Sequence, residues 1–244
     1  MTDRVIRSDA GQVCTLTLNR PEALNALDTD TFVALNTHLE TLEQQTDSIG
    51  CVVLRGAGRA FCAGADLKVM ASVIVEPGFK PGVVERLARL PQPVIAAVHG
   101  ACYTGGLELA LACDLIVADP TARLADTHGK WGLVGAWGMG QRLRDRMGTA
   151  AAKRMMLSAQ PIDAIEAHRL GLVDVLADEG ALDAAVAELA AQIAANARHT
   201  NLHVKHSLRE TDGMSVAQGV MWEADHYPGL SPDYAERIDR FATR

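Results

Sequence analysis

Residues His99–Asp114 read HGACYTGGLELALACD, and this stretch decides the fold class. The residues that lead into it, PVIAAVHG (Pro93–Gly100), form a β-rich apolar run, and LIVAD (Leu115–Asp119), which follows it, is again strand-like. Gly105 and Gly106 open an apolar helix between these two strands. The succession of strand, helix and strand predicts an α/β fold whose sheets are buried on both faces.

Strands and helices also alternate closer to the N-terminus. VCTLTLN (Val13–Asn19) alternates between two faces, as a strand does, and CVVLRG (Cys51–Gly56) is a short buried strand. Between them, apolar residues at helical spacing predict a helix across Asp30–Gln45, with Asp28 and Thr29 as candidate N-caps.

The chain after about Asp145 has a different pattern. It shows helical signals only, such as the Ala-rich run Ala181–Arg198. We therefore expect an α/β core over residues 1–190 and a helical C-terminal region over residues 191–244.

Composition restricts the class of partner. The chain has 244 residues and a formal net charge of −7, whereas binding to nucleic acid requires a basic face. The N-terminal MTDRVIRSDAG lacks the apolar region of a secretory signal, and no apolar run approaches the ~18–20 residues that a membrane span requires. We therefore expect a cytoplasmic protein with no membrane span and no nucleic-acid partner.

The cysteines argue against disulfides and metal binding. They are odd in number and scattered, with no C-x-x-C pair and no Cys/His metal spacing. We expect no metal site and free, buried thiols at Cys14, Cys51, Cys62, Cys102 and Cys113.

Two glycine-containing turns are candidates for a site. One is FCAGADL (Phe61–Leu67), and the other precedes the helix that Gly105 and Gly106 open. Small residues let a backbone approach a ligand closely, and two separate turns that each offer one N–H can form an oxyanion hole. For either turn alone, a tight turn without a ligand remains the alternative.

Glu108 is the second candidate feature. It lies one turn into the apolar helix, within LELALA, where burial of a carboxylate is unfavourable unless it has a function. Burial would raise its pKa and suit it to general-base catalysis near neutral pH. A surface glutamate is the alternative, but the neighbouring residues leave little room for a polar face.

These segments together resemble the crotonase, or enoyl-CoA hydratase/isomerase, superfamily. The similar segments, in the family's order, are NRPEALNALD (Asn19–Asp28), RAFCAGADL (Arg59–Leu67), VHGACYTGGLELALACDL (Val98–Leu115), GMGQRL (Gly138–Leu143) and LGLVD (Leu170–Asp174). The resemblance implies an α/β spiral of ββα units with two roughly perpendicular sheets. It also implies that the helical C-terminal region serves trimer formation, as a homotrimer or a dimer of trimers.

The resemblance further implies roles for individual residues. The N–H groups of Ala65 and Gly105 would form the oxyanion hole for an acyl-CoA thioester. The residues that would contact the coenzyme A part of this substrate are Ala26, Ala63, Asp66, Leu67 and, at a phosphate, Lys68. We expect no cofactor, because coenzyme A enters as part of the substrate and the thioester is the electron sink.

One position departs from the family pattern. Hydratases of this family use two glutamates; Glu108 matches the first, but His128 stands at the second. A histidine can supply or accept the second proton, or it can be a structural residue in an altered pocket. Asp126, two residues earlier, either orients the imidazole or caps the turn.

The function that we predict is hydration of a trans-2-enoyl-CoA, with Glu108 and His128 as catalytic residues. Double-bond isomerisation, dehydration of a substituted acyl-CoA and C–C bond hydrolysis of a diketone are alternatives on the same scaffold. A non-catalytic acyl-CoA binder is the alternative from another class, although such a binder gains nothing from a buried charge.

Overall fold

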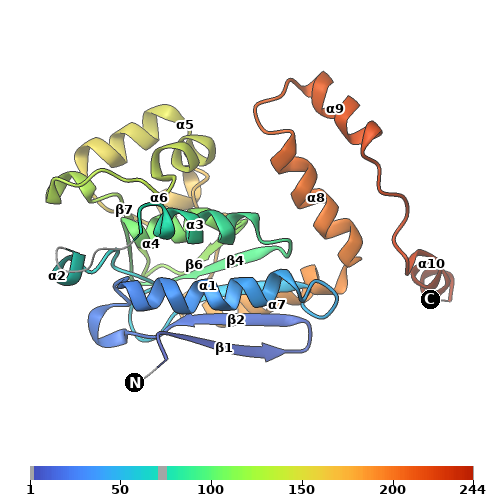
Figure 1. Ribbon diagram of the computed structural model, residues 1–244, viewed down its shortest axis with the longest axis horizontal. Coiled ribbons are helices and arrows are strands. Elements are labelled where there is room, and N and C mark those ends of the chain that lie inside the picture. The colour runs from blue at the N-terminus through green and yellow to red at the C-terminus, as the bar shows by residue number, and fades with distance from the viewer. Residues whose placement is uncertain (1–2, 71–75, 244) are drawn as a thin grey trace.

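The computed structural model describes residues 3–70 and 76–243 and is a mixed α/β fold (Figure 1). Its larger sheet has the strand order β1-β2-β3-β4-β6-β9. Only the β1–β2 pair is antiparallel; all other neighbours are parallel. The strands are β1 (Val5–Ala10), β2 (Val13–Leu18), β3 (Cys51–Gly56), β4 (Val94–Val98), β6 (Leu115–Ala118) and β9 (Val175–Leu176).

A smaller sheet contains β5 (Ala101–Tyr103), β7 (Arg123–Ala125) and β8 (Ile162–Asp163) in that order. Strands β4 and β5 precede helix α4 (Gly105–Ala112), and strands β6 and β7 precede helix α5 (Met139–Ser158). Each of these units therefore supplies one strand to each sheet and then a helix. This is the ββα unit that the family resemblance implies.

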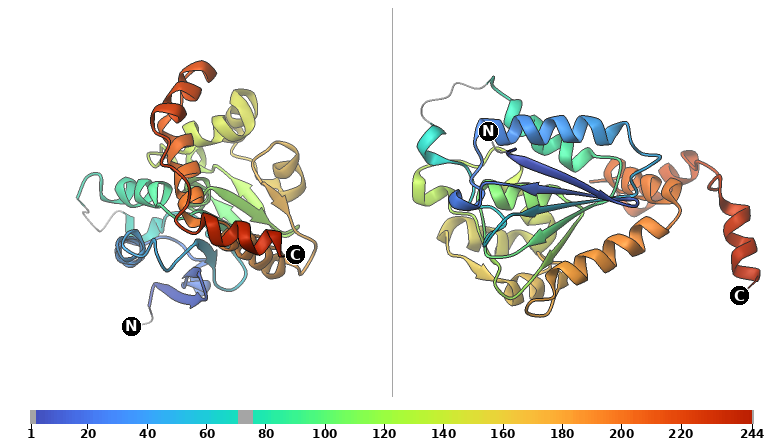
Figure 2. Two further views of the ribbon diagram at one scale, coloured as in Figure 1. Left: turned by 90° about the vertical axis from the view of Figure 1, so that its right-hand side faces the viewer. Right: turned by 90° about the horizontal axis from the view of Figure 1, so that it is seen from below.

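The remaining helices lie around the two sheets or extend beyond them (Figures 1 and 2). They are α1 (Thr29–Glu43), α2 (Leu67–Met70), α3 (Phe79–Arg89), α6 (Ala164–Arg169), α7 (Leu182–Ala195), α8 (Arg198–Glu210), α9 (Val216–Asp225) and α10 (Tyr234–Ala242). Short 3-10 turns span Pro21–Ala23 and His128–Trp131. Figure 2 shows α1 on one side of the larger sheet and α7 on the other.

The central strands are buried on both faces, as the sequence predicts. In β3, Val52 and Leu54 belong to the main core, whereas Cys51 and Val53 belong to a second cluster that α7 covers. Side chains alternate across a strand, so a strand covered on both faces reads as a continuous apolar run. The prediction that the five cysteines are buried and free is confirmed.

Helix α1 begins where the sequence predicts. The side chain of Asp28 accepts a hydrogen bond from the Thr31 N–H at 2.8 Å, so Asp28, and not Thr29, is the N-cap. Burial alone would raise the pKa of Asp28, but the hydrogen bonds from Thr31 and the nearby guanidinium charges hold it below its ordinary value.

The prediction of helices only after about Asp145 is wrong. Strand β8 pairs with β7, and β9 extends the larger sheet beside β6. Each has only two residues, too few to produce the alternating pattern by which strands are recognised in a sequence. The run Ala181–Arg198 is also interrupted, because Asn196 adopts an extended conformation between α7 and α8.

The division of the chain at residue 190 remains a proposal, and α7 crosses it. Val186 and Ala190 pack on the larger sheet, and Ile193 and Ala194 pack against the same cluster. Helices α8, α9 and α10 then lead away from the sheets to the C-terminus (Figures 1 and 2). Within the described part of the chain, no helix is both long and apolar enough to cross a membrane.

Candidate active site

Two loops that are far apart in the sequence, residues 19–28 and residues 59–67, lie side by side at the site. The Ala63 N–H donates to the Leu24 carbonyl at 2.9 Å, and the Leu27 N–H donates to the Gly64 carbonyl at 2.8 Å. A bridge between Leu27 and Ala65 continues this pairing. Four residues predicted to bind substrate are thereby brought together: Ala26, Ala63, Ala65 and Asp66.

The N–H groups predicted to form the oxyanion hole, those of Ala65 and Gly105, have no acceptor within residues 3–70 and 76–243. Gly105 is the first residue of α4, where the leading N–H groups have no partner inside the helix. Gly106 lets the helix approach the Ala65 loop, since a Cβ at this position would stand 2.3 Å from the Cys62 carbonyl oxygen.

A pocket of about 270 Å³ opens beside these loops. It is lined by Ala63, Ala65, Leu67, Tyr103, Thr104, Thr127, His128, Lys130, Trp131 and Leu133. Gly105 and Glu108 do not line this pocket; both are buried. Trp131 is 61% exposed, whereas the Trp137 ring packs edge-on against Phe32 and covers Gly105.

Glu108 is buried, with a side-chain exposure of 1%, as the sequence predicts. Its Oε1 accepts a hydrogen bond from the Trp137 N–H at 2.9 Å. Burial raises the pKa of Glu108, and the Trp137 N–H and the charge of His128 oppose that shift only in part. A carboxyl group in this environment is suited to take up a proton near neutral pH.

His128 is held by Asp126 through two hydrogen bonds. The Nδ1 atom of His128 lies 2.6 Å from Asp126 Oδ1, and the same oxygen accepts from the His128 N–H at 3.0 Å. Asp126 therefore both orients the imidazole and caps the turn. Its hydrogen bond raises the pKa of His128, although partial burial opposes the shift.

Glu108 and His128 face each other across a short gap. His128 Nε2 lies 3.9 Å from Glu108 Oε2, too far for a hydrogen bond and close enough for one water molecule to contact both atoms. Because Nδ1 faces Asp126, Nε2 is the ring nitrogen that faces Glu108. Glu108 and His128 can therefore each accept or release one proton at this position.

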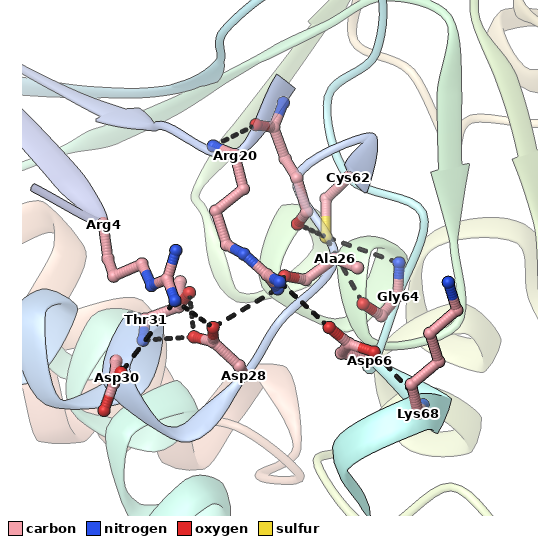
Figure 3. A network of polar contacts seen from close by, with 11 residues as sticks. Arg4, Arg20, Ala26, Asp28, Asp30, Thr31, Cys62, Gly64, Asp66 and Lys68 are labelled. Carbon is pink, nitrogen blue, oxygen red and sulfur yellow. Dashed lines mark hydrogen bonds and ion pairs between the residues drawn. The ribbon is translucent and has the colours of Figure 1, made fainter. Parts of the chain in front are cut away.

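Arg20 connects the two loops in a network of ion pairs, which Figure 3 shows. Its guanidinium lies 3.0 Å from Asp66 Oδ2 and 3.4 Å from Asp28 Oδ2, and it donates to the Ala26 carbonyl. The Asp66 side chain also accepts from the Lys68 N–H at 3.1 Å. Asp66 therefore joins the loop to the start of α2, and its predicted contact with coenzyme A stays a prediction.

The other predicted contacts lie at the edge of the pocket. Leu67 is 41% exposed and lines the pocket, and the Lys68 side chain is exposed. In the described residues no group of three His, Cys, Asp or Glu side chains could hold a metal ion. Burial raises the pKa of Cys62 to about 12, so this thiol is no nucleophile at neutral pH.

Some residues of the site could not be found in the sequence. The group that holds Glu108 is the main-chain N–H of Trp137, and no side-chain pattern identifies a main-chain donor. Thr104 and Thr127 line the pocket, yet neither stands in a recognisable motif. The distance between Glu108 and His128 also depends on how α4, β6 and β7 pack together, which local sequence does not predict.

Comparison with known proteins places this architecture in one family. A sequence model of the enoyl-CoA hydratase/isomerase family matches residues 8–229. The chain is 30% identical to the probable peroxisomal enoyl-CoA hydratase 1 of Arabidopsis thaliana, over 97% of this chain and 91% of that protein. It is 36% identical to the short-chain-enoyl-CoA hydratase of Clostridium acetobutylicum, over 80% of this chain and 77% of that protein.

Solved structures agree with the sequence comparison. The crystal structure of an enoyl-CoA hydratase from Bacillus anthracis superposes with a TM-score of 0.93 at 30% identity, covering 98% of this chain and 96% of that chain. The enoyl-CoA hydratase from Mycobacterium tuberculosis H37Rv gives a TM-score of 0.91 at 33% identity, covering 99% and 96%. The chain belongs to the enoyl-CoA hydratase/isomerase family of the crotonase superfamily.

Proposed function

We propose that the protein is an enoyl-CoA hydratase that adds water to a trans-2-enoyl-CoA. The observation that carries this proposal is the pair of Glu108 and His128, 3.9 Å apart, next to two N–H groups without an acceptor in the described residues. Hydration requires a base for water, an acid for the α-carbon and a stabilised enolate, and this set of groups can supply all three.

The thioester oxygen would accept hydrogen bonds from the N–H groups of Ala65 and Gly105. Glu108 would take a proton from water while the water oxygen bonds to the β-carbon, and the electron pair would move to the thioester oxygen. His128, whose protonated form the hydrogen bond with Asp126 favours, would then give a proton to the α-carbon. Transfer of a proton from Glu108 to His128 through solvent would restore both groups.

The test is hydration of crotonyl-CoA, followed as loss of the absorbance of the conjugated thioester. We expect turnover by the wild-type protein and a loss of about 10²–10⁴-fold in the variant Glu108→Gln. The matched control is Glu188→Gln, an exposed glutamate on α7, which should keep wild-type activity. No turnover by the wild-type protein, with binding intact, would reject the hydratase and favour a binder.

The contact between Asp126 and His128 favours one second candidate. A histidine oriented by a carboxylate is a common general base for hydrolysis, so C–C bond hydrolysis of a diketone is the alternative. Release of one carboxylic acid and one ketone from a 1,3-diketone, without hydration of crotonyl-CoA, would support it. Hydration without such cleavage would exclude it.

A further inference from the structure

Thr104, the residue between β5 and Gly105, has an unusual backbone conformation with φ 46° and ψ −115°. A β-branched residue rarely adopts positive φ, because its side chain crowds the backbone. Two hydrogen bonds hold it there: its N–H donates to the Ala125 carbonyl, and its carbonyl accepts from the Glu108 N–H, both at 2.9 Å. Strained residues of this kind cluster at functional sites.

The Thr104 hydroxyl forms no hydrogen bond that explains its presence. Thr104 occupies the N-cap position of α4, yet its hydroxyl caps no helical N–H. Nor does any other group in residues 3–70 and 76–243 form a hydrogen bond with this hydroxyl, although Thr104 is only 7% exposed. The hydroxyl oxygen is not among the fully enclosed polar atoms that lack a partner in the described residues, so it is open to the pocket that Thr104 lines, where a ligand can be its partner.

The hydroxyl lies close to the loop that carries one N–H group of the proposed oxyanion hole. Thr104 Oγ1 stands 1.9 Å from the position that a Cβ on Gly64 would occupy. Gly64 precedes Ala65, and Thr104 itself precedes Gly105, so the hydroxyl is adjacent to both loops. Thr104 also lines the pocket that contains Ala65.

We infer that the Thr104 hydroxyl contacts the substrate and donates a third hydrogen bond to the thioester oxygen, beside the N–H groups of Ala65 and Gly105. The inference rests on the proposed function only for the class of ligand, an acyl-CoA, and not for the hydration step. Hydrogen bonds to an ionised acceptor are stronger than those to a neutral one. The third donor therefore favours the enolate over the uncharged thioester.

The test uses 3-oxobutanoyl-CoA, whose enolate has a near-ultraviolet absorbance that the neutral form lacks. Titration of the wild-type protein gives a dissociation constant and the fraction bound as enolate, without any turnover. The decisive variant is Thr104→Val, which keeps the β-branched shape and the backbone strain but removes the hydroxyl. Thr104→Ser keeps the hydroxyl, and Thr104→Gly removes both the hydroxyl and the strain.

We expect Thr104→Val and Thr104→Gly to weaken enolate binding by about tenfold or more, and Thr104→Ser to stay within about threefold of the wild-type value. Thr15→Val, in β2, should bind as the wild-type protein does. The inference would be overturned if Thr104→Val bound the enolate as tightly as the wild-type protein does. It would also be overturned if only Thr104→Gly did so. So would failure of the wild-type protein to bind 3-oxobutanoyl-CoA.

The two proposals can fail separately. If crotonyl-CoA is not hydrated but the enolate signal depends on Thr104, the hydratase proposal is rejected and the inference stands. If crotonyl-CoA is hydrated at the same rate by Thr104→Val and by the wild-type protein, and the enolate signal is also unchanged, only the inference is rejected.

Discussion

At the scale of the residue, Glu108 is a carboxyl group that the fold keeps away from water. Its folded-state pKa is raised by burial, so the folded protein binds this proton more tightly than the unfolded chain does. The contribution of Glu108 to stability is therefore fully present below its unfolded pKa of ~4.3 and is lost as the pH rises through the folded value. Above that pH, the ionised side chain destabilises the fold.

The variant Glu108→Gln should therefore be more stable than the wild-type protein at pH 8. If removal of this buried charge stabilises the fold by about 1 kcal/mol, the Tm should rise by about 2–4 °C in a chain of this size. The gain in Tm should shrink as the pH falls towards 5. Thermal unfolding at both pH values measures the effect, with Glu188→Gln as the control. A lower Tm at pH 8 would mean that local hydrogen bonds outweigh burial at this carboxylate.

A second prediction concerns the charge of Asp126. If His128 is the acid, turnover falls as the pH rises through its pKa, which Asp126 raises. The variant Asp126→Asn removes the charge, so the alkaline limb of the rate profile should move to lower pH and kcat at pH 8 should fall about tenfold.

The pH profile of kcat for crotonyl-CoA measures this shift. The matched control is Asp178→Asn, an exposed residue, which should leave the profile unchanged. An equal loss of kcat at every pH in Asp126→Asn would show that Asp126 supports the structure of the turn and does not set the pKa of His128.

Residue types indicated much of the candidate site, and backbone geometry accounts for what they missed. Glu108 was predicted to be buried because its helix has no polar face, and His128 and Asp126 were identified by their positions. The conformation of Thr104 could not be predicted, because threonine ordinarily avoids positive φ. Its strain becomes visible only when the flanking strand and helix fix both of its ends.

At the scale of the element, helix α4 determines where the site lies. All eight of its residues are buried, and its first turn meets the loop that contains Cys62. That approach is possible because Gly106 has no side chain. The contact between the main chains of α4 and the Cys62 loop therefore sets the position of the site.

The variant Gly106→Ala should lose stability and activity together. Its Cβ would stand 2.3 Å from a main-chain oxygen, so α4 or the Cys62 loop must move. We expect a loss of about 1–3 kcal/mol in the free energy of unfolding, measured by denaturant titration. The control is Gly140→Ala in α5, where a Cβ meets Met156 at an ordinary 3.5 Å; this variant should be at least as stable as the wild-type protein.

An unchanged unfolding midpoint in Gly106→Ala would contradict the close contact between α4 and the Cys62 loop.

The longer elements of this region were predictable, because β4, α4 and β6 each carry a run of four or more apolar residues. Strands β8 and β9 were missed because pairing with a neighbouring strand, and not local sequence, defines them.

At the scale of the whole molecule, helices α8–α10 extend from the body (Figure 2). They also expose apolar side chains. Large apolar residues that are at least 40% exposed in this region are Val204, Leu208, Met214, Val216, Val220, Met221, Tyr227, Leu230, Tyr234, Ile238 and Phe241. A chain that exposes so many apolar groups on one segment is expected to bury them against another copy.

We therefore predict self-association in solution, as the homotrimer or dimer of trimers that the family resemblance implies, measured as the mass by light scattering. Replacing Val220 and Met221 with glutamate should lower that mass, because two charges would have to be desolvated in the contact. The control is Val33→Glu, on the exposed face of α1, which should leave the mass unchanged. A monomer at micromolar concentration for the wild-type protein would reject the prediction.

The sequence predicts the helices of this C-terminal segment but not the direction in which they extend. The break at Asn196 and the turns that follow set the path, and the partners that would cover its apolar faces lie outside one chain.

The proposed oxyanion donors have a consequence for engineering. The two N–H groups, at Ala65 and Gly105, belong to the main chain, and every variant without proline at these positions keeps them. Mutagenesis can therefore reshape the pocket through the side chains of Ala63 or Leu67 without deleting either donor, provided that Gly106 is kept. Libraries built on this scaffold can therefore vary the lining of the pocket while the proposed main-chain donors are retained.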